Sequence, residues 1–155
     1  MALLFRLQDE AGGDWASFVP VIGGWSDERL SLSVGDVGPG VVLHATARPV
    51  NVEGAPAGPG VFALRWFECE AADAEEFVEL SASAWPAFEA ATPGTQIFGL
   101  FRAVEVPAGA ARFLLCTRYP SLSAWESSRA DTRSPQFRRR AELTRRTKVS
   151  VWRLA

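Results

Sequence analysis

Two hydrophobic periodicities divide the second half of the chain into strands and helices. Residues 61–69 form a run of apolar and aromatic side chains, which predicts a strand. After it, apolar residues recur at spacings of three and four, the pattern of one helix face. These residues are Phe77, Leu80, Ala84 and Phe88. We therefore expect a strand followed by an amphipathic helix.

Polar residues and prolines mark the ends of this helix. Asp73 followed by Glu76 is a capping-box signal for its start, and we expect it to run to about Ala91. Pro86 lies inside it and cannot donate a backbone hydrogen bond, so a kink or break is expected just before that residue.

The remaining pattern completes a known order of elements. Residues 96–106 and 112–119 predict two strands of an antiparallel hairpin, and residues 149–154 predict a last strand. Between them, Ser121 is expected to cap a helix to about residue 130, and Ser134 before Pro135 to start a second one. The order β-α-β-β-α-β is ferredoxin-like, so the predicted fold class is α+β.

The first sixty residues have a different pattern. Short apolar runs alternate with Gly, Pro and Ser-Asp punctuation, which predicts short strands and turns; the runs are 3–7, 18–22, 30–34 and 41–50. Regular structure must then break in the Gly- and Pro-rich run 53–60. We expect a β-rich N-terminal arm and linker in residues 1–60 and a ferredoxin-like domain in residues 61–155.

Composition and charge narrow the class of protein. The chain has 155 residues, of which 48% are hydrophobic, enough for one domain with a real core. A net charge of −2 gives no general attraction to nucleic acid or anionic membranes. No signal peptide or long apolar stretch is present, so a soluble, cytoplasmic protein is expected. Arginine accounts for all basic residues except Lys148, which suggests a GC-rich bacterial genome.

Charge is unevenly distributed within the predicted domain. Residues 66–92 contain seven acidic residues and no basic one, whereas residues 129–155 contain nine basic and two acidic residues. The two predicted helices could pair with each other or with a second subunit. They could also present two solvated faces.

Four segments of the predicted domain together resemble the NIPSNAP family. The segments are residues 62–67 (Phe-Ala-Leu-Arg-Trp-Phe), the helix from Phe77 through Trp85 and Phe88, residues 98–102 (Phe-Gly-Leu-Phe-Arg) and residues 119–122 (Tyr-Pro-Ser-Leu). The family's first strand typically reads Tyr-Glu-Leu-Arg-x-Tyr, and its third ends in Tyr-x-Ser-Leu. The resemblance covers about residues 61–155.

This resemblance implies a dimeric α/β barrel, in which two ferredoxin-like sheets face each other and enclose a pocket. The chain would then be a homodimer, or its barrel would be completed by its own N-terminal arm. The family's first-strand Glu is Ala63 here, and its third-strand His is most nearly Leu115. Related barrels that degrade haem or oxidise polyketides commonly use His, Asn and Trp, but residues 61–155 contain no His or Asn.

Arg65 and His44 are the candidate catalytic residues. The resemblance favours the strand face of Arg65 as the pocket face, where a guanidinium could anchor a carboxylate, enolate or phenolate. Alternatively, Arg65 pairs with Glu68 or Glu105 at a rim. His44 is the only imidazole and could act as a general base if residues 41–50 cover the barrel mouth. It could equally be a structural histidine.

Further residues are candidates for binding a flat, apolar ligand or for packing in the core. They are Trp66, Phe67, Trp85, Phe101 and Trp152. Arg102 and Arg118, each in a predicted strand, are second candidates for the anion anchor, with a rim ion pair as the alternative. Cys69 and Cys116 are expected to be buried thiols, and no metal, phosphate-loop or dinucleotide motif is present, so no cofactor is expected.

These observations favour a protein that binds a small ring-containing molecule. Our first hypothesis is a cofactor-independent cyclase, isomerase or monooxygenase of bacterial secondary metabolism. The alternatives are a non-catalytic NIPSNAP-like protein that binds a ligand or partner and, less favoured, a haem-binding barrel. A buried His44 close to Arg65 would favour an enzyme, whereas a solvent-filled or side-chain-filled barrel would favour the binding protein.

Overall fold

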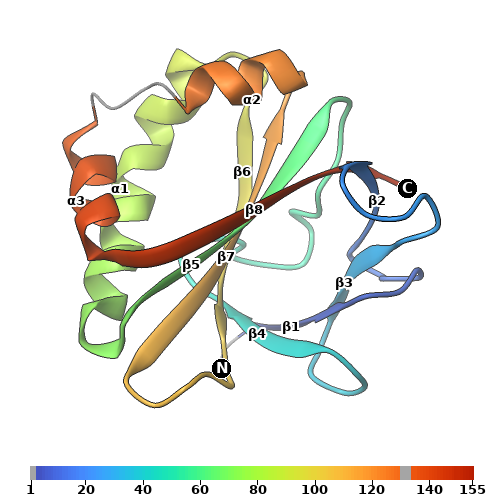
Figure 1. The fold of residues 1–155 in the computed structure, drawn as a ribbon, viewed down its shortest axis with the longest axis horizontal. Helices are drawn as coiled ribbons and strands as arrows, with labels where there is room; N and C mark the ends of the chain where they lie inside the picture. Colours follow the sequence, from blue (N-terminus) through green and yellow to red (C-terminus); the bar gives the residue numbers. More distant parts are fainter. Residues whose placement is uncertain (1–2, 130–133) are drawn as a thin grey trace.

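Eight antiparallel strands close into a barrel within one chain, and helices pack against one side of it (Figure 1). The structure is a computed structural model that describes residues 3–129 and 134–155. Its strands are β1 (Leu4–Gln8), β2 (Ala16–Ile22), β3 (Leu30–Val34), β4 (Val41–Ala45), β5 (Val61–Glu70), β6 (Gln96–Ala103), β7 (Ala110–Tyr119) and β8 (Thr144–Leu154). Its helices are the 3-10 turn η1 (Ala71–Asp73), α1 (Ala74–Ala91), α2 (Leu122–Ser128) and α3 (Pro135–Leu143).

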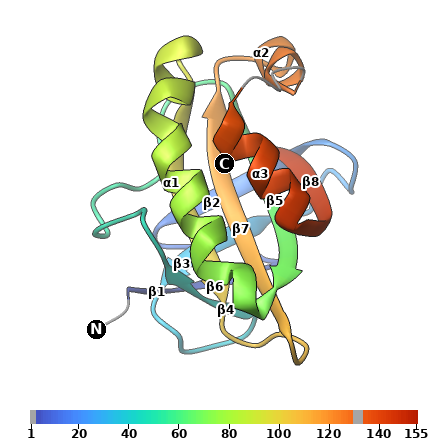
Figure 2. The same cartoon turned by 90° about the vertical axis from the view of Figure 1, so that its left-hand side faces the viewer.

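The second half of the chain is a ferredoxin-like unit, as predicted. Its strands lie in the order β8-β5-β7-β6, and β6 and β7 pair antiparallel as the expected hairpin. The helices α1, α2 and α3 connect these strands; α1 and α3 lie over one face of the sheet, and α2 lies at one end of it (Figure 2). The α+β, ferredoxin-like fold class is therefore confirmed.

The N-terminal strands close this sheet into a barrel. β4 pairs with β6, and β2 pairs with β8, so each edge of the ferredoxin-like sheet is covered by a strand of the same chain. β1 and β3 complete the circle between them. A second copy of the protein is not needed to close the barrel. This arrangement matches the alternative in which the arm completes the barrel.

Large apolar side chains from both halves fill the inside of the barrel. The innermost side chains, all 2% exposed or less, include Phe5, Phe18, Leu32, Leu43, Phe62, Leu64, Phe101 and Leu114. An eight-stranded barrel is just wide enough for side chains to fill its interior. The expected ligand pocket between facing sheets is therefore replaced by a packed core.

The boundaries of α1 show how local signals are modified by their surroundings. The helix begins after Asp73, although this side chain forms no capping hydrogen bond, and it continues unbroken through Pro86. The expected break at Pro86 does not occur. Pro86 lies on the exposed side of the helix, where water can reach the carbonyl group that lacks a partner.

The other helices begin where expected. The Ser121 hydroxyl accepts a hydrogen bond from the Ala124 backbone at 3.0 Å, and Ser134 accepts one from Phe137 at 3.3 Å. α2 is described to Ser128, and its expected end near residue 130 lies outside the described residues. The last strand starts earlier than predicted, at Thr144, because it pairs with β5 through four charged and polar residues.

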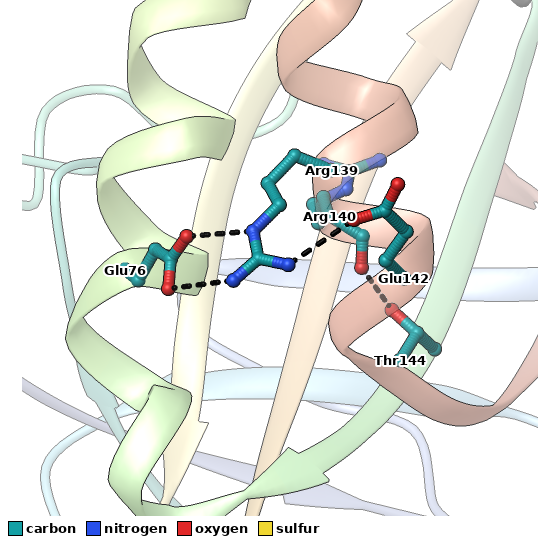
Figure 3. Close-up of polar contacts among 5 residues, drawn as sticks. All are labelled: Glu76, Arg139, Arg140, Glu142 and Thr144. Carbon is teal, nitrogen blue, oxygen red and sulfur yellow. Dashed lines mark hydrogen bonds and ion pairs between the residues drawn. The ribbon is translucent and has the colours of Figure 1, made fainter.

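The acidic and basic segments pair with each other in this structure. Arg139 of α3 donates to Glu76 of α1 at 2.9 Å and to Glu142 at 3.1 Å (Figure 3). On the neighbouring strands, Arg146 pairs with Glu68 at 3.1 Å, and Arg145 pairs with Glu70. These contacts tie α3 and β8 to the elements beside them.

Both cysteines are buried and free, as expected. Cys116 lies in the barrel core, where burial raises the pKa of its thiol to about 12. Burial also raises the pKa of the Cys69 thiol, which lies beneath α1. The two thiols are therefore structural side chains.

The packed barrel interior leads to a stability prediction. Phe62 is 0% exposed, and its ring centroid lies 5.7 Å from that of Phe18 and 5.8 Å from that of Phe98. Replacing Phe62 with Ala should lower the free energy of unfolding by about 3–5 kcal/mol, because it leaves a cavity between these rings. Urea denaturation measures this loss. The control Val37→Ala, at a side chain that is 83% exposed, should change it by less than about 0.5 kcal/mol.

Candidate functional site

A pocket of about 530 Å³ lies between the outer face of the ferredoxin-like sheet and the helices. β5, β7 and β8 supply its floor, and α1, α2 and α3 supply its walls. It lies outside the barrel, beneath the three helices seen in Figure 2. The sheet thus separates the packed barrel core on its inner face from the pocket on its outer face.

Three of the predicted site residues line this pocket: Arg65, Phe67 and Trp85. Side chains alternate along β5, so Arg65 and Phe67 point outward while Phe62 and Leu64 point into the barrel. Trp85 lies on the buried face of α1. The strand face that the NIPSNAP resemblance favoured is therefore the face that carries the pocket.

The other aromatic candidates pack in or on the barrel core. Phe101 is fully buried, with its ring centroid 5.1 Å from that of Phe5. Trp66 and Trp152 pack against the same core, and the Trp152 indole donates to the Ser150 hydroxyl at 2.7 Å. None of these three rings lines the pocket between sheet and helices.

The polar candidates His44, Arg102 and Arg118 also lie away from the pocket. His44 on β4 is directly opposite Arg102 on β6, and the imidazole Nδ1 lies 3.4 Å from the Ala45 carbonyl oxygen. Arg118 donates to the Ala57 carbonyl in the linker at 2.8 Å. The structure therefore does not bring His44 together with Arg65.

Arg140 is a pocket residue that the sequence analysis did not single out. Its guanidinium carbon lies 4.8 Å from the ring centroid of Phe67 and 4.5 Å from that of Phe137. It also donates to the Ser81 hydroxyl of α1 at 3.1 Å. A signal was present, because Arg140 follows Phe137 by three residues and so shares its helix face. Because Arg138 and Arg139 precede it in the sequence, Arg140 could not be distinguished from exposed arginines of the same helix.

Arg65 and Arg140 both lie near the Phe67 ring, whose centroid is 5.9 Å from the Arg65 guanidinium carbon. Arg65 donates to the Thr147 hydroxyl at 3.3 Å. Within the described residues, neither arginine has a carboxylate within ion-pair distance. The alternative pairing of Arg65 with Glu68 or Glu105 is not formed in the described chain, and Glu68 binds Arg112 and Arg146 instead.

Burial and mutual repulsion determine the electrostatics of these two arginines. Burial lowers the pKa of the Arg65 guanidinium, and repulsion from Arg129 adds to this effect. Burial and then repulsion from Arg65 lower the pKa of Arg140 to about 10. Both arginines remain charged at neutral pH. The pocket therefore favours an anion.

Aromatic rings also contribute to the pocket wall. Phe88 of α1 meets the ring of Tyr119 edge to face, with centroids 6.4 Å apart, and that of Phe137 at 5.6 Å. The Arg129 guanidinium carbon lies 5.0 Å from the centroid of Trp125. Such surfaces favour flat, ring-containing ligands.

The pocket contains few groups for acid–base or metal chemistry. No His, Asp, Glu or Cys is among its described lining residues. In the same described part of the chain, no cluster of three such side chains is placed to hold a metal ion. Its chemistry is therefore that of guanidinium, hydroxyl and aromatic groups.

Comparison with known proteins identifies the fold. No protein-family model and no curated protein sequence matches the chain. A solved structure from Listeria monocytogenes, a ferredoxin-fold protein related to antibiotic biosynthesis monooxygenases, is 12% identical with a TM-score of 0.65, over 99% of this chain and 95% of that chain. A monooxygenase-like protein from Listeria innocua is 11% identical with a TM-score of 0.66, over 99% and 94%.

A heme-degrading enzyme from Listeria monocytogenes is also similar, at 12% identity and a TM-score of 0.62, over 98% of this chain and 99% of that chain. At such low identity these likenesses show a shared fold. The chain thus shares its fold with these solved structures over nearly its whole length. None of the helices in the described ranges combines the length and apolar character needed to cross a membrane.

Arg140 has no carboxylate partner among the described residues, which leads to a stability prediction. Replacing Arg140 with Met should raise the free energy of unfolding by about 1 kcal/mol, because it removes a desolvated cation and fills the space among the phenylalanine rings. Urea denaturation at pH 7 measures the change. Arg138→Met, at an exposed position of the same helix, is the matched control and should leave stability nearly unchanged. A large loss in the Arg140 variant would show that this cation is a structural residue.

Proposed function

We propose that the pocket between sheet and helices binds a flat, ring-containing small molecule that carries a negative charge. The observation that supports this most directly is the pair Arg65 and Arg140, which lie beside one aromatic ring with no carboxylate partner in the described chain. A ligand carboxylate or phenolate would supply the missing charge, and the aromatic walls would contact its rings.

A binding protein is the simplest form of this proposal. The barrel is filled by side chains, and His44 lies away from Arg65, so the general base expected of an enzyme is not at the pocket. The NIPSNAP resemblance of residues 61–155 supports a non-catalytic, ligand-binding member of such barrels. Its ligand would be a product or intermediate of bacterial secondary metabolism, bound in the cytoplasm.

A cofactor-independent enzyme is the second candidate. Two guanidinium groups can stabilise the enolate or phenolate form of a ring substrate, which cyclisation, isomerisation and oxygenation of such rings require. The fold shared with monooxygenase-like proteins is consistent with this function. Arg65 and Arg140 would then act on the reacting oxygen, and Phe67 and Trp85 would position the ring.

Haem fits the pocket less well. Its propionates would match the arginines, but no His, Cys or Met is among the described lining residues, and the only side chain there that commonly binds haem iron is the phenol of Tyr119. The heme-degrading activity of one structural neighbour is therefore a weaker guide than the charge of the pocket.

Ligand binding can be tested with 2-naphthoate, a flat aromatic carboxylate. Calorimetric titration of the full chain should detect binding, and Arg65→Gln or Arg140→Gln should weaken it about tenfold or more, because each removes a charge-assisted hydrogen bond. Arg138→Gln changes an exposed arginine of the same helix and should bind like the unmodified protein. Absence of binding, or equal affinity in all variants, would contradict the proposal.

We also propose that the protein is a homodimer, as the resemblance implied. Because the barrel closes within one chain, the interface would lie on its outer surface. Native mass spectrometry of the protein purified from its own host reports the number of subunits and any retained small molecule. The expected result is a dimer that carries an organic ligand. A bare monomer would contradict the dimer and leave partner binding as the favoured role.

A further inference from the structure

A second pocket, of about 430 Å³, lies at one mouth of the barrel. Its lining residues come from the ends of neighbouring strands: Val41 begins β4, Ala103 ends β6, and Arg112 lies near the start of β7. We call this space the barrel-mouth pocket. The proposed function gives it no role.

The alternation of side chains along β5 places this pocket on the inner face of the sheet. Phe62 and Leu64 point into the barrel, so Trp66 and Glu68 point to the same side, beyond the packed core. Phe67 contributes to the lining of both pockets, as expected for a residue of a strand that lies between them. The barrel-mouth pocket and the helix-covered pocket therefore lie on opposite faces of β5.

Trp66 gives the barrel-mouth pocket an apolar floor. Its half-buried indole packs against the barrel core on one side and lines the pocket on the other. Ala103 and Val41 add aliphatic surface, and Val41 remains 40% exposed. A ligand that covers Trp66 and Val41 would remove apolar surface from water, which is favourable.

Most of the charged side chains around this floor have a partner. The Glu68 carboxylate accepts a hydrogen bond from Arg112 at 2.7 Å and from Arg146 at 3.1 Å. Both arginines thus share one carboxylate. Glu105 follows β6, next to β7 and on the same side of the pocket as Arg112.

Lys148 is the cation that this network leaves without a partner. It lies directly opposite Trp66 on β8, so the two side chains project to the same side of the sheet. Among the residues that the structure describes, no carboxylate lies within ion-pair distance of its ammonium group. The pocket lining holds three cations and two carboxylates, which leaves one positive charge unbalanced; they are Arg112, Arg146, Lys148, Glu68 and Glu105.

We propose that the barrel-mouth pocket is a second ligand site, which binds an aliphatic monocarboxylate of about six to eight carbons. The carboxylate pairs with the Lys148 ammonium group and balances the remaining charge. The chain lies on Trp66 and against Val41 and Ala103. An alkyl chain suits these walls because they offer one ring and aliphatic side chains, whereas the helix-covered pocket is lined by several rings. This inference does not depend on the proposed function.

Calorimetric titration of the full chain with octanoate tests the site. Octanoate should bind, and butanoate should bind at least about tenfold more weakly, because it lacks four methylene groups that would cover the apolar floor. Octylammonium, which has the opposite charge, should not bind detectably. Equal affinity for octanoate and octylammonium, or no binding of octanoate, would overturn the proposal.

Two substitutions assign the carboxylate to this pocket. Lys148→Met keeps an apolar side chain but removes the charge, and it should weaken octanoate binding about fivefold. Arg138→Met, at an exposed position of α3, is the control and should leave the affinity unchanged. Arg65→Gln should also leave it unchanged. If Arg65→Gln weakens octanoate binding and Lys148→Met does not, the probe binds in the helix-covered pocket and the barrel-mouth site is wrong.

A spectroscopic measurement checks the contact directly. Because Lys148 is the only lysine of the chain, incorporation of ¹³C-labelled lysine gives one side-chain Cε signal. This signal should shift with octanoate over the concentration range seen by calorimetry, and it should do so equally in Arg65→Gln. An unchanged signal at saturation would overturn the role of Lys148. The proposed function would be unaffected, because it is tested separately by 2-naphthoate binding.

Discussion

The pairing of β4 with β6 and of β2 with β8 determines where everything else in the molecule can lie. These two contacts use the chain's own N-terminal arm to cover both edges of the ferredoxin-like sheet. The inner face of that sheet then packs on apolar side chains from the arm, such as Phe5 and Phe18. Because the barrel interior is filled, the pocket that contains Arg65 and Trp85 lies on the outer face of the sheet, beneath the helices.

The outer face combines two energetically opposed requirements. The helices must pack on it through apolar contacts, as Phe77 and Trp85 do, yet the face also carries Arg65 and Arg140 without carboxylate partners in the described chain. Neighbouring contacts offset the unfavourable free energy of desolvating these two guanidinium groups. Arg139 pairs with Glu76 and links α3 to α1 (Figure 3). The adjacent Arg140 lies over the ring of Phe137 in α3. The packing of α3 against α1 therefore helps to keep the Arg140 guanidinium in the pocket.

Local patterns predicted the ferredoxin-like order because period-two and helical spacing depend on neighbouring residues only. They also predicted that Arg65 and Phe67 share a face. They could not show that the barrel interior is filled, since this depends on how the volumes of two distant halves fit together. The position of His44 depends on the register of β4 with β6, which is equally non-local. The start of β8 was not predicted because its first residues are charged or polar and form a strand only by pairing with β5. Arg140 was not predicted as a pocket residue because it lies in a run of charged residues, and only the tertiary structure shows that it is buried.

The arrangement of polar groups in the pocket bears on the choice between binding and catalysis. An acid–base enzyme places a group that exchanges protons near neutral pH beside the reacting atoms. Here the arginines stay protonated, and burial moves the phenol of Tyr119 further from neutrality. The two guanidinium groups can therefore donate hydrogen bonds to oxygen atoms and stabilise charge on them. No group among the described lining residues is suited to take a proton from a substrate near neutral pH. Binding, or a reaction in which the substrate is already acidic, is the chemistry that this set of side chains supports.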